Sequence, residues 1–84
     1  MSDSVRVKVY TSTHCGYCRA AKGLLDQRSI PFEEIDLSQD TAARVSLVER
    51  TGWQTVPVIE IDGTLIGGFM ELRAHAMNGG LDDF

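Results

Sequence analysis

Apolar and polar residues alternate at the start of the chain. Val5, Val7 and Val9 are separated by the charged residues Arg6 and Lys8. A period of two places successive side chains on opposite faces of a β-strand, so this segment predicts a half-buried strand. The polar stretch at residues 11–14 breaks the alternation and predicts a loop.

The pattern changes to a helical one from Cys15 to about Arg28. Apolar side chains there lie three or four positions apart, as on one face of an α-helix. They belong to Tyr17, Ala21, Leu24 and Leu25. Pro31 disfavours helical geometry in the residue before it, so the helix is expected to end near Ser29.

A second strand and a second helix follow. Residues 32–37 predict a strand, and residues 41–51 predict a helix. Asp40 can accept hydrogen bonds from the free amides at the start of that helix. Gly52 can end it, because glycine adopts the left-handed conformation at no steric cost.

The last third of the chain predicts a β-hairpin and a third helix. Asp62-Gly63 is a strong signal for a tight hairpin turn, here between strands at residues 57–61 and 64–67. The final helix begins after Gly68 and ends at residues 78–80, which contain two glycines.

The predicted element order is therefore β-α-β-α-β-β-α. A strand–helix–strand unit implies two parallel strands joined by a right-handed crossover, and the hairpin adds two antiparallel strands. The expected architecture is α/β, a four-stranded mixed sheet flanked by three helices. This is the arrangement of the thioredoxin fold, and we expect residues 1–84 to form one such domain.

The composition and the lengths of the apolar runs argue against two classes of function, nucleic-acid binding and membrane association. The net charge is −4 and the basic residues are scattered singly, which argues against nucleic acid as a partner. No apolar run is long enough to cross a bilayer, so no membrane association is expected. Residues 1–4 lack the pattern of a signal segment. We therefore expect the protein to lie in the cytoplasm, where structural disulfides are rare. We also expect a monomer.

Cys15 and Cys18 carry the candidate chemistry. Cys15 falls where the first loop meets the first helix, and the partial positive charge at a helix start stabilises a thiolate. Cys18 lies one turn later on the inward face of the helix. An exposed thiolate and a shielded second thiol within reach are what disulfide exchange requires.

Three other interpretations of this cysteine pair are weaker. A structural disulfide closing so short a loop contributes little chain entropy. A zinc site needs four ligands, and the only imidazoles are His14 and His75, so no metal is expected. A packed Cys18 beside an idle Cys15 is compatible with how often cysteine is buried. The position at the start of the helix of a β-α-β unit favours redox chemistry.

Over residues 5–81 the chain resembles a glutaredoxin. The motifs that carry the resemblance occur in the order and spacing of that family. They are Tyr10-Thr11, Cys15-Gly16-Tyr17-Cys18, Phe32–Leu37, Thr55-Val56-Pro57, Ile66-Gly67-Gly68 and Gly79-Gly80-Leu81. The dithiol Cys-Gly-Tyr-Cys site lies at the centre of the likeness.

The resemblance implies a glutathione-dependent thiol–disulfide oxidoreductase that reduces protein disulfides and glutathionylated proteins. Cys15 would be the nucleophile and Cys18 the resolving thiol, with a cis bond before Pro57. Glutathione would lie in a groove, its γ-glutamyl carboxylate on backbone amides after Gly67-Gly68. The implied glutathione-binding residues are Tyr17, Gln54, Thr55, Val56, Pro57, Gly68, Phe69 and Met70.

The chain departs from the family pattern at three positions that bear on glutathione. Gly16 replaces a common proline, Ser12 a common lysine, and Met70 a common aspartate. The neighbouring Glu71 is a possible substitute for that aspartate. The lysine and the aspartate each make a charged contact with glutathione in the family. Without these two contacts, the affinity for glutathione is expected to fall by about tenfold or more.

Two alternative functions follow from the same departures. Gly16 and Trp53 resemble the monothiol branch of the family, whose members hold a [2Fe–2S] cluster between two subunits. Here Cys15 and the thiolate of glutathione would be the ligands of such a cluster in a dimer. The missing lysine and aspartate instead suggest an electron donor recycled by thioredoxin reductase. For Trp53 itself, packing beside the second helix is the favoured interpretation.

Overall fold

The computed structural model describes residues 5–82 and contains the elements in the predicted order. In chain order they are β1 (Val7–Thr11), α1 (Gly16–Gln27), β2 (Phe32–Asp36), α2 (Thr41–Thr51), β3 (Val58–Ile61), β4 (Thr64–Gly67) and α3 (Phe69–Met77). The expected absence of a signal segment concerns residues 1–4, which lie outside the described residues. The first strand begins two residues later than predicted, because Val5 is exposed rather than packed.

The described strands form one mixed sheet in the order β2-β1-β3-β4. β1 runs parallel to β2 and antiparallel to β3, and β3 pairs with β4 in a hairpin. Both Asp62 and Gly63 at the hairpin turn have positive φ, of 53° and 80°. This is the backbone that a two-residue hairpin requires, so the predicted turn is confirmed.

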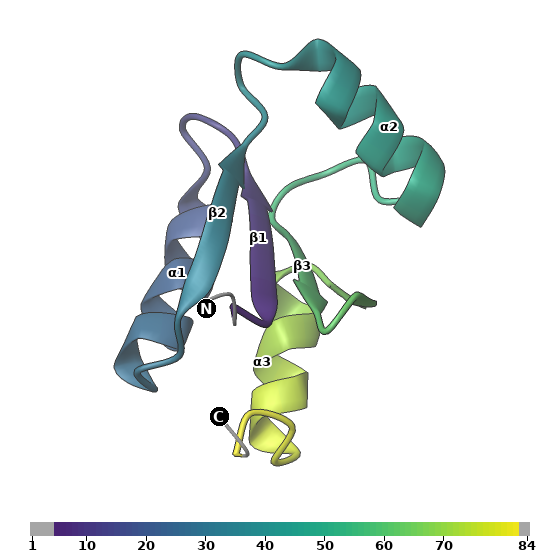
Figure 1. Cartoon of the computed structure of the whole chain (residues 1–84). Helices are drawn as coiled ribbons and strands as arrows, with labels where there is room; N and C mark the ends of the chain where they lie inside the picture. The colour runs from purple at the N-terminus through teal and green to yellow at the C-terminus, as the bar shows by residue number, and fades with distance from the viewer. Residues whose placement is uncertain (1–4, 83–84) are drawn as a thin grey trace.

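Helices cover both faces of the sheet. α1 and α3 pack on one face, where the larger apolar core lies, and Figure 1 shows α2 set apart from these two helices. The larger core contains Val7, Val9, Ala21, Leu25, Ile30, Ile59, Ile61, Leu72, Ala76 and Leu81. A smaller cluster of Leu37, Leu47 and Val58 holds α2 on the other face. The predicted thioredoxin fold is confirmed.

The predicted limits of α2 are also confirmed, and each has a local cause. The Asp40 carboxylate accepts a hydrogen bond of 2.9 Å from the amide of Ala43 at the start of the helix. Gly52 ends the helix with a φ of 78°. In the described part of the chain, no helix combines the length and apolar character needed to cross a membrane.

Tyr17 lies outside the buried face of α1. The helical spacing grouped it with Ala21 and Leu25, which are buried against the sheet. Its own side chain is 65% exposed. Tyr17 lies in the first turn of α1, beyond the reach of the core, and its ring faces α3 instead.

Candidate active site

Cys15 and Cys18 lie at the start of α1, where a disulfide joins them. Cys15 is the N-cap residue of the helix, and Cys18 lies in its first turn. Their Cα atoms are 5.2 Å apart, within the range for bonded cysteines. Cys15 is half-buried whereas Cys18 is buried, so the predicted asymmetry between a reachable and a shielded sulfur is present.

The sulfur of Cys15 caps the helix. The backbone amide of Cys18 donates a hydrogen bond of 3.1 Å to Cys15 Sγ. Serine, threonine or aspartate oxygens usually accept this bond at helix starts. In the reduced protein, the same amide and the positive end of the helix dipole stabilise a thiolate at this position.

A carbonyl group faces the same sulfur from the other side. The backbone oxygen of Val56 lies 3.7 Å from Cys15 Sγ. The Val56–Pro57 peptide bond is cis, as the family resemblance implied. The segment before β3 is thus positioned directly against the candidate nucleophile.

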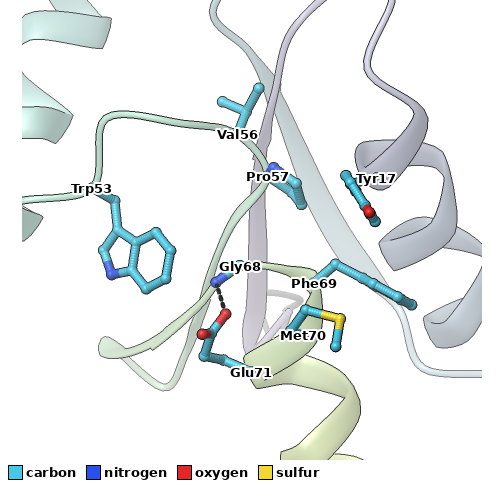
Figure 2. Close-up of a pocket in the computed structure, with 8 residues that line it drawn as sticks. All are labelled: Tyr17, Trp53, Val56, Pro57, Gly68, Phe69, Met70 and Glu71. Atoms are coloured by element: carbon cyan, nitrogen blue, oxygen red, sulfur yellow. Dashed lines mark hydrogen bonds between the residues drawn. The ribbon is translucent and has the colours of Figure 1, made fainter.

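A groove of about 270 Å³ extends from this point between α1, the segment before β3 and the start of α3. Figure 2 shows Tyr17 and Trp53 on opposite sides of it. The residues that line the groove are Tyr17, Trp53, Val56, Pro57, Gly68, Phe69, Met70 and Glu71. The structure therefore brings together most of the residues predicted to bind glutathione.

Gln54 and Thr55 are exposed and are not among the residues that line the groove. Their contact with glutathione stays a prediction. Trp53 and Glu71 do line it, although the sequence favoured a packing role for Trp53. Trp53 has both environments, because it also packs against the smaller apolar cluster under α2.

The start of α3 forms the floor of the groove. The Glu71 carboxylate accepts a hydrogen bond of 3.0 Å from the amide of Gly68, as the dashed line in Figure 2 marks. Gly67 has a φ of 125°, and a Cβ there would approach Trp53 to 2.9 Å and Glu71 to 2.8 Å. Glycine is therefore needed for Trp53 and Glu71 to lie this close to the backbone.

The aromatic rings of Tyr17 and Phe69 join α1 to α3 beside the disulfide. Their centroids are 6.0 Å apart and their planes are inclined by 29°, a stacked arrangement. Phe69 is half-buried, and Met70 next to it is 59% exposed. The rim of the groove nearest to α1 is consequently apolar.

A second hollow, of about 260 Å³, lies on the other side of the cysteines and is polar. Within it Lys22 forms an ion pair of 3.0 Å with Glu34, and the Thr11 hydroxyl donates a 2.8 Å hydrogen bond to the same carboxylate oxygen. These bonds from Lys22 and Thr11 lower the pKa of Glu34 below its ordinary value of 4.5. His14 and Arg19 also line this hollow.

Within residues 5–82, no three His, Cys, Asp or Glu side chains gather closely enough to hold a metal ion. The Cys15 sulfur is bonded to Cys18 in this structure, so it is not available as a ligand for a cluster in this oxidised form. The site as described is a dithiol–disulfide centre.

A thioredoxin fold with a Cys-x-x-Cys pair at the start of α1 defines a thiol–disulfide oxidoreductase. The family model of glutaredoxins matches residues 7–66, and the chain belongs to the glutaredoxin family. It is 41% identical over 76 residues to glutaredoxin 3 of Escherichia coli (strain K12), a match that covers 90% of this chain and 92% of that protein. The glutaredoxin of Pseudomonas aeruginosa is 38% identical over 76 residues, covering 90% of each chain.

A solved structure shows the same architecture. The crystal structure of a buckwheat glutaredoxin–glutathione complex superimposes with a TM-score of 0.87 at 33% identity. The match covers 93% of this chain and 74% of the buckwheat chain. The family predicted from the sequence motifs is thus confirmed, together with its fold and its class of reaction.

Proposed function

We propose that this glutaredoxin reduces protein disulfides and glutathione mixed disulfides, with Cys15 as the nucleophile and Cys18 as the resolving thiol. The hydrogen bond from the Cys18 amide to Cys15 Sγ is the main support for this assignment. It favours negative charge on the half-buried sulfur, which a substrate can reach. The buried sulfur of Cys18 is close enough to form the second bond.

The reaction begins when the Cys15 thiolate attacks one sulfur of a substrate disulfide. A bond forms between Cys15 Sγ and that sulfur, the substrate S–S bond breaks, and the other sulfur leaves as a thiolate that takes a proton from solvent. With a protein disulfide, the Cys18 thiolate then attacks Cys15 Sγ and releases the reduced substrate. The enzyme is left with the Cys15–Cys18 disulfide, and two glutathione molecules reduce it.

A glutathione mixed disulfide can follow a shorter route. Cys15 attacks the glutathione sulfur, the protein thiol leaves, and a second glutathione attacks the Cys15–glutathione bond to give oxidised glutathione. We place glutathione in the groove described above, with its γ-glutamyl carboxylate near the amides of Phe69 and Met70. Amides in the first turn of a helix have no partner within the helix and can bind an anion.

We also propose that the protein is a monomer and that it acts in the cytoplasm. Its partners would be glutathione and protein substrates. The buckwheat complex contains glutathione, which supports glutathione as the reducing partner here. Recycling by thioredoxin reductase and a carrier role for a [2Fe–2S] cluster rest on the sequence departures alone, and no contact among residues 5–82 adds support to either.

Replacing each cysteine separately tests the assignment. Cys15→Ser is expected to abolish reduction of both a glutathionylated peptide and a protein disulfide such as that of insulin. Cys18→Ser is expected to retain the first activity and lose the second, because only protein disulfides require the resolving thiol. Full activity of Cys15→Ser on either substrate would show that the assignment is wrong.

A further inference from the structure

The polar hollow on the side of the cysteines away from the groove gives the buried Cys18 a polar neighbourhood. Cys18 is 2% exposed, yet it lines this hollow together with Lys22 and Glu34. Its thiol has to lose a proton before it can attack Cys15, and burial opposes the charged form of a thiol. A hollow of about 260 Å³ with polar walls has room for water that can accept this proton.

Lys22 lies one helical turn after Cys18 on α1. Side chains four positions apart are neighbours on one face of a helix, with Cβ atoms about 5–6 Å apart. An ammonium group within such reach of a sulfur stabilises the thiolate relative to the neutral thiol. The Lys22 side chain is only 28% exposed, so its charge is screened less than that of a fully exposed cation.

Glu34 fixes the place of the Lys22 ammonium group. One oxygen of its carboxylate pairs with Lys22 at 3.0 Å and accepts a hydrogen bond of 2.8 Å from the buried Thr11 hydroxyl. These two bonds lower the pKa of Glu34, so the ion pair is intact above about pH 4.5. An ammonium group has three N–H donors, and among residues 5–82 Glu34 is the one hydrogen-bond partner of Lys22. Donors therefore remain that can face a thiolate across the hollow.

The other charged or titratable side chains around the hollow are less well placed to act on Cys18. They are His14, Arg19 and Asp36. Arg19 follows Cys18 directly, and adjacent residues of a helix do not face each other. Both Arg19 and His14 are exposed. The Asp36 carboxylate accepts a hydrogen bond of 2.8 Å from a backbone amide after β2.

We propose that Lys22 stabilises the thiolate of Cys18 in the resolving step, and that Glu34 is the positioning residue that holds Lys22 there. In this step the Cys18 thiol gives its proton to water, and the thiolate attacks Cys15 Sγ. The Cys15–Cys18 bond forms and the bond from Cys15 to the substrate sulfur breaks. That sulfur leaves as a thiolate and takes a proton from solvent. This inference rests on the proposed function and concerns its second step alone.

Oxidised glutathione separates the two steps in one experiment. The reduced enzyme first forms the Cys15–glutathione bond and releases one glutathione, and Cys18 then displaces the other. Mass spectrometry of acid-quenched samples follows the rise and the decay of this mixed disulfide. Lys22→Met is expected to slow the decay about tenfold at pH 7 and to move the midpoint of its pH profile up by about one unit. The rise should change much less.

Glu34→Gln separates the charge of Lys22 from the packing of the ion pair. Glutamine keeps an oxygen that accepts from Lys22 and Thr11 but removes the negative charge. The decay is therefore expected to be as fast as in the unaltered enzyme or faster, with its midpoint at lower pH. Arg73→Met is the matched control, because Arg73 is an exposed cation on α3 that does not line the hollow, and both rates should stay unchanged.

Two outcomes overturn the proposal. One is an unchanged decay in Lys22→Met. The other is a slowing of equal size in Glu34→Gln, which would assign the effect to the ion pair as a structural link. If the unaltered enzyme forms no mixed disulfide at Cys15, the proposed function itself fails.

Discussion

The backbone amide of Cys18 donates a hydrogen bond of 3.1 Å to Cys15 Sγ. The sulfur that caps α1 is thus also the sulfur that we propose attacks a substrate. Because the donor is a main-chain group, it stays in place when the side chain of residue 18 is changed. Reactivity of Cys15 is consequently a property of the helix start and not of its partner thiol.

Gly67→Ala is expected to destabilise the protein and displace Trp53. The φ of 125° at this position is one that residues with a Cβ rarely adopt, which costs about 1–3 kcal/mol. The added Cβ would also approach the Trp53 ring to 2.9 Å. Urea unfolding measures the first effect, and the fluorescence of Trp53, the single tryptophan of the chain, reports the second.

Gly23→Ala is the control for Gly67→Ala, because the same substitution is expected to stabilise the protein at position 23. Gly23 lies inside α1, and nothing lies within 4 Å of a Cβ built there. Alanine should raise the free energy of unfolding by about 0.5–1 kcal/mol, because it restricts the unfolded chain and favours the helix. The account of Gly67 is wrong if both substitutions shift stability in the same direction.

Arg50→Met is expected to lower the free energy of unfolding by about 1–3 kcal/mol. Arg50 on α2 forms an ion pair with the buried Glu60 of β3. The Tyr10 hydroxyl contacts both, at 3.3 Å from Glu60 and 3.2 Å from Arg50. Glu60 and Tyr10 raise the pKa of Arg50. Removing the guanidinium leaves a buried carboxylate without its cation, although the 51% exposure of Arg50 lets water screen part of the loss.

The double variant Arg50→Met/Glu60→Gln tests whether the buried Glu60 carboxylate causes the loss of stability in Arg50→Met. Without the buried charge, the loss of the guanidinium should matter less, so the double variant is expected to be more stable than Arg50→Met alone. Urea unfolding of the unaltered protein, both single variants and the double variant makes the comparison. Strictly additive effects of the two changes would mean that the pair contributes no coupling.

Acid is expected to destabilise the protein partly through Glu34. Since its pKa is lowered in the folded protein, the unfolded chain binds this proton first as the pH falls. The stabilisation is therefore complete above about pH 4.5 and is lost as the pH passes through the lower folded pKa. Lys22→Met should reduce stability at pH 7 by about 0.5–1 kcal/mol and have little effect at pH 2 to 3.

Arg73→Met is the matched control for this pH dependence. Arg73 is exposed on α3 and forms no ion pair with another residue of the described range 5–82. Its replacement should change stability little, and by the same amount at both pH values. If Lys22→Met behaves in the same way, the ion pair with Glu34 does not contribute to acid sensitivity.

The element order could be predicted from the sequence because its signals are local. The alternation around Val7 and Val9, the cap at Asp40 and the turn at Asp62-Gly63 each depend on a few neighbouring residues. The dithiol site was predictable for the same reason, since Cys15 and Cys18 lie in one turn of helix.

Features that depend on distant residues could not be predicted in this way. The helical spacing of α1 does not show that Tyr17 is exposed and stacks on Phe69, because periodicity gives the side of a helix but not what covers it. Trp53 borders the groove only because β4 brings Gly67 beside it. The cluster of Arg50, Tyr10 and Glu60 joins three elements that no local pattern connects.

The reactivity of Cys15 toward iodoacetamide tests the central claim most directly. It is measured against pH in Cys18→Ser, which keeps the amide donor and leaves one cysteine. We predict that alkylation of the folded variant stays rapid at least about one pH unit below the range in which an unstructured cysteine reacts as a thiolate. The same protein unfolded in urea supplies that reference. Coincident pH profiles of the folded and unfolded variant would contradict the account.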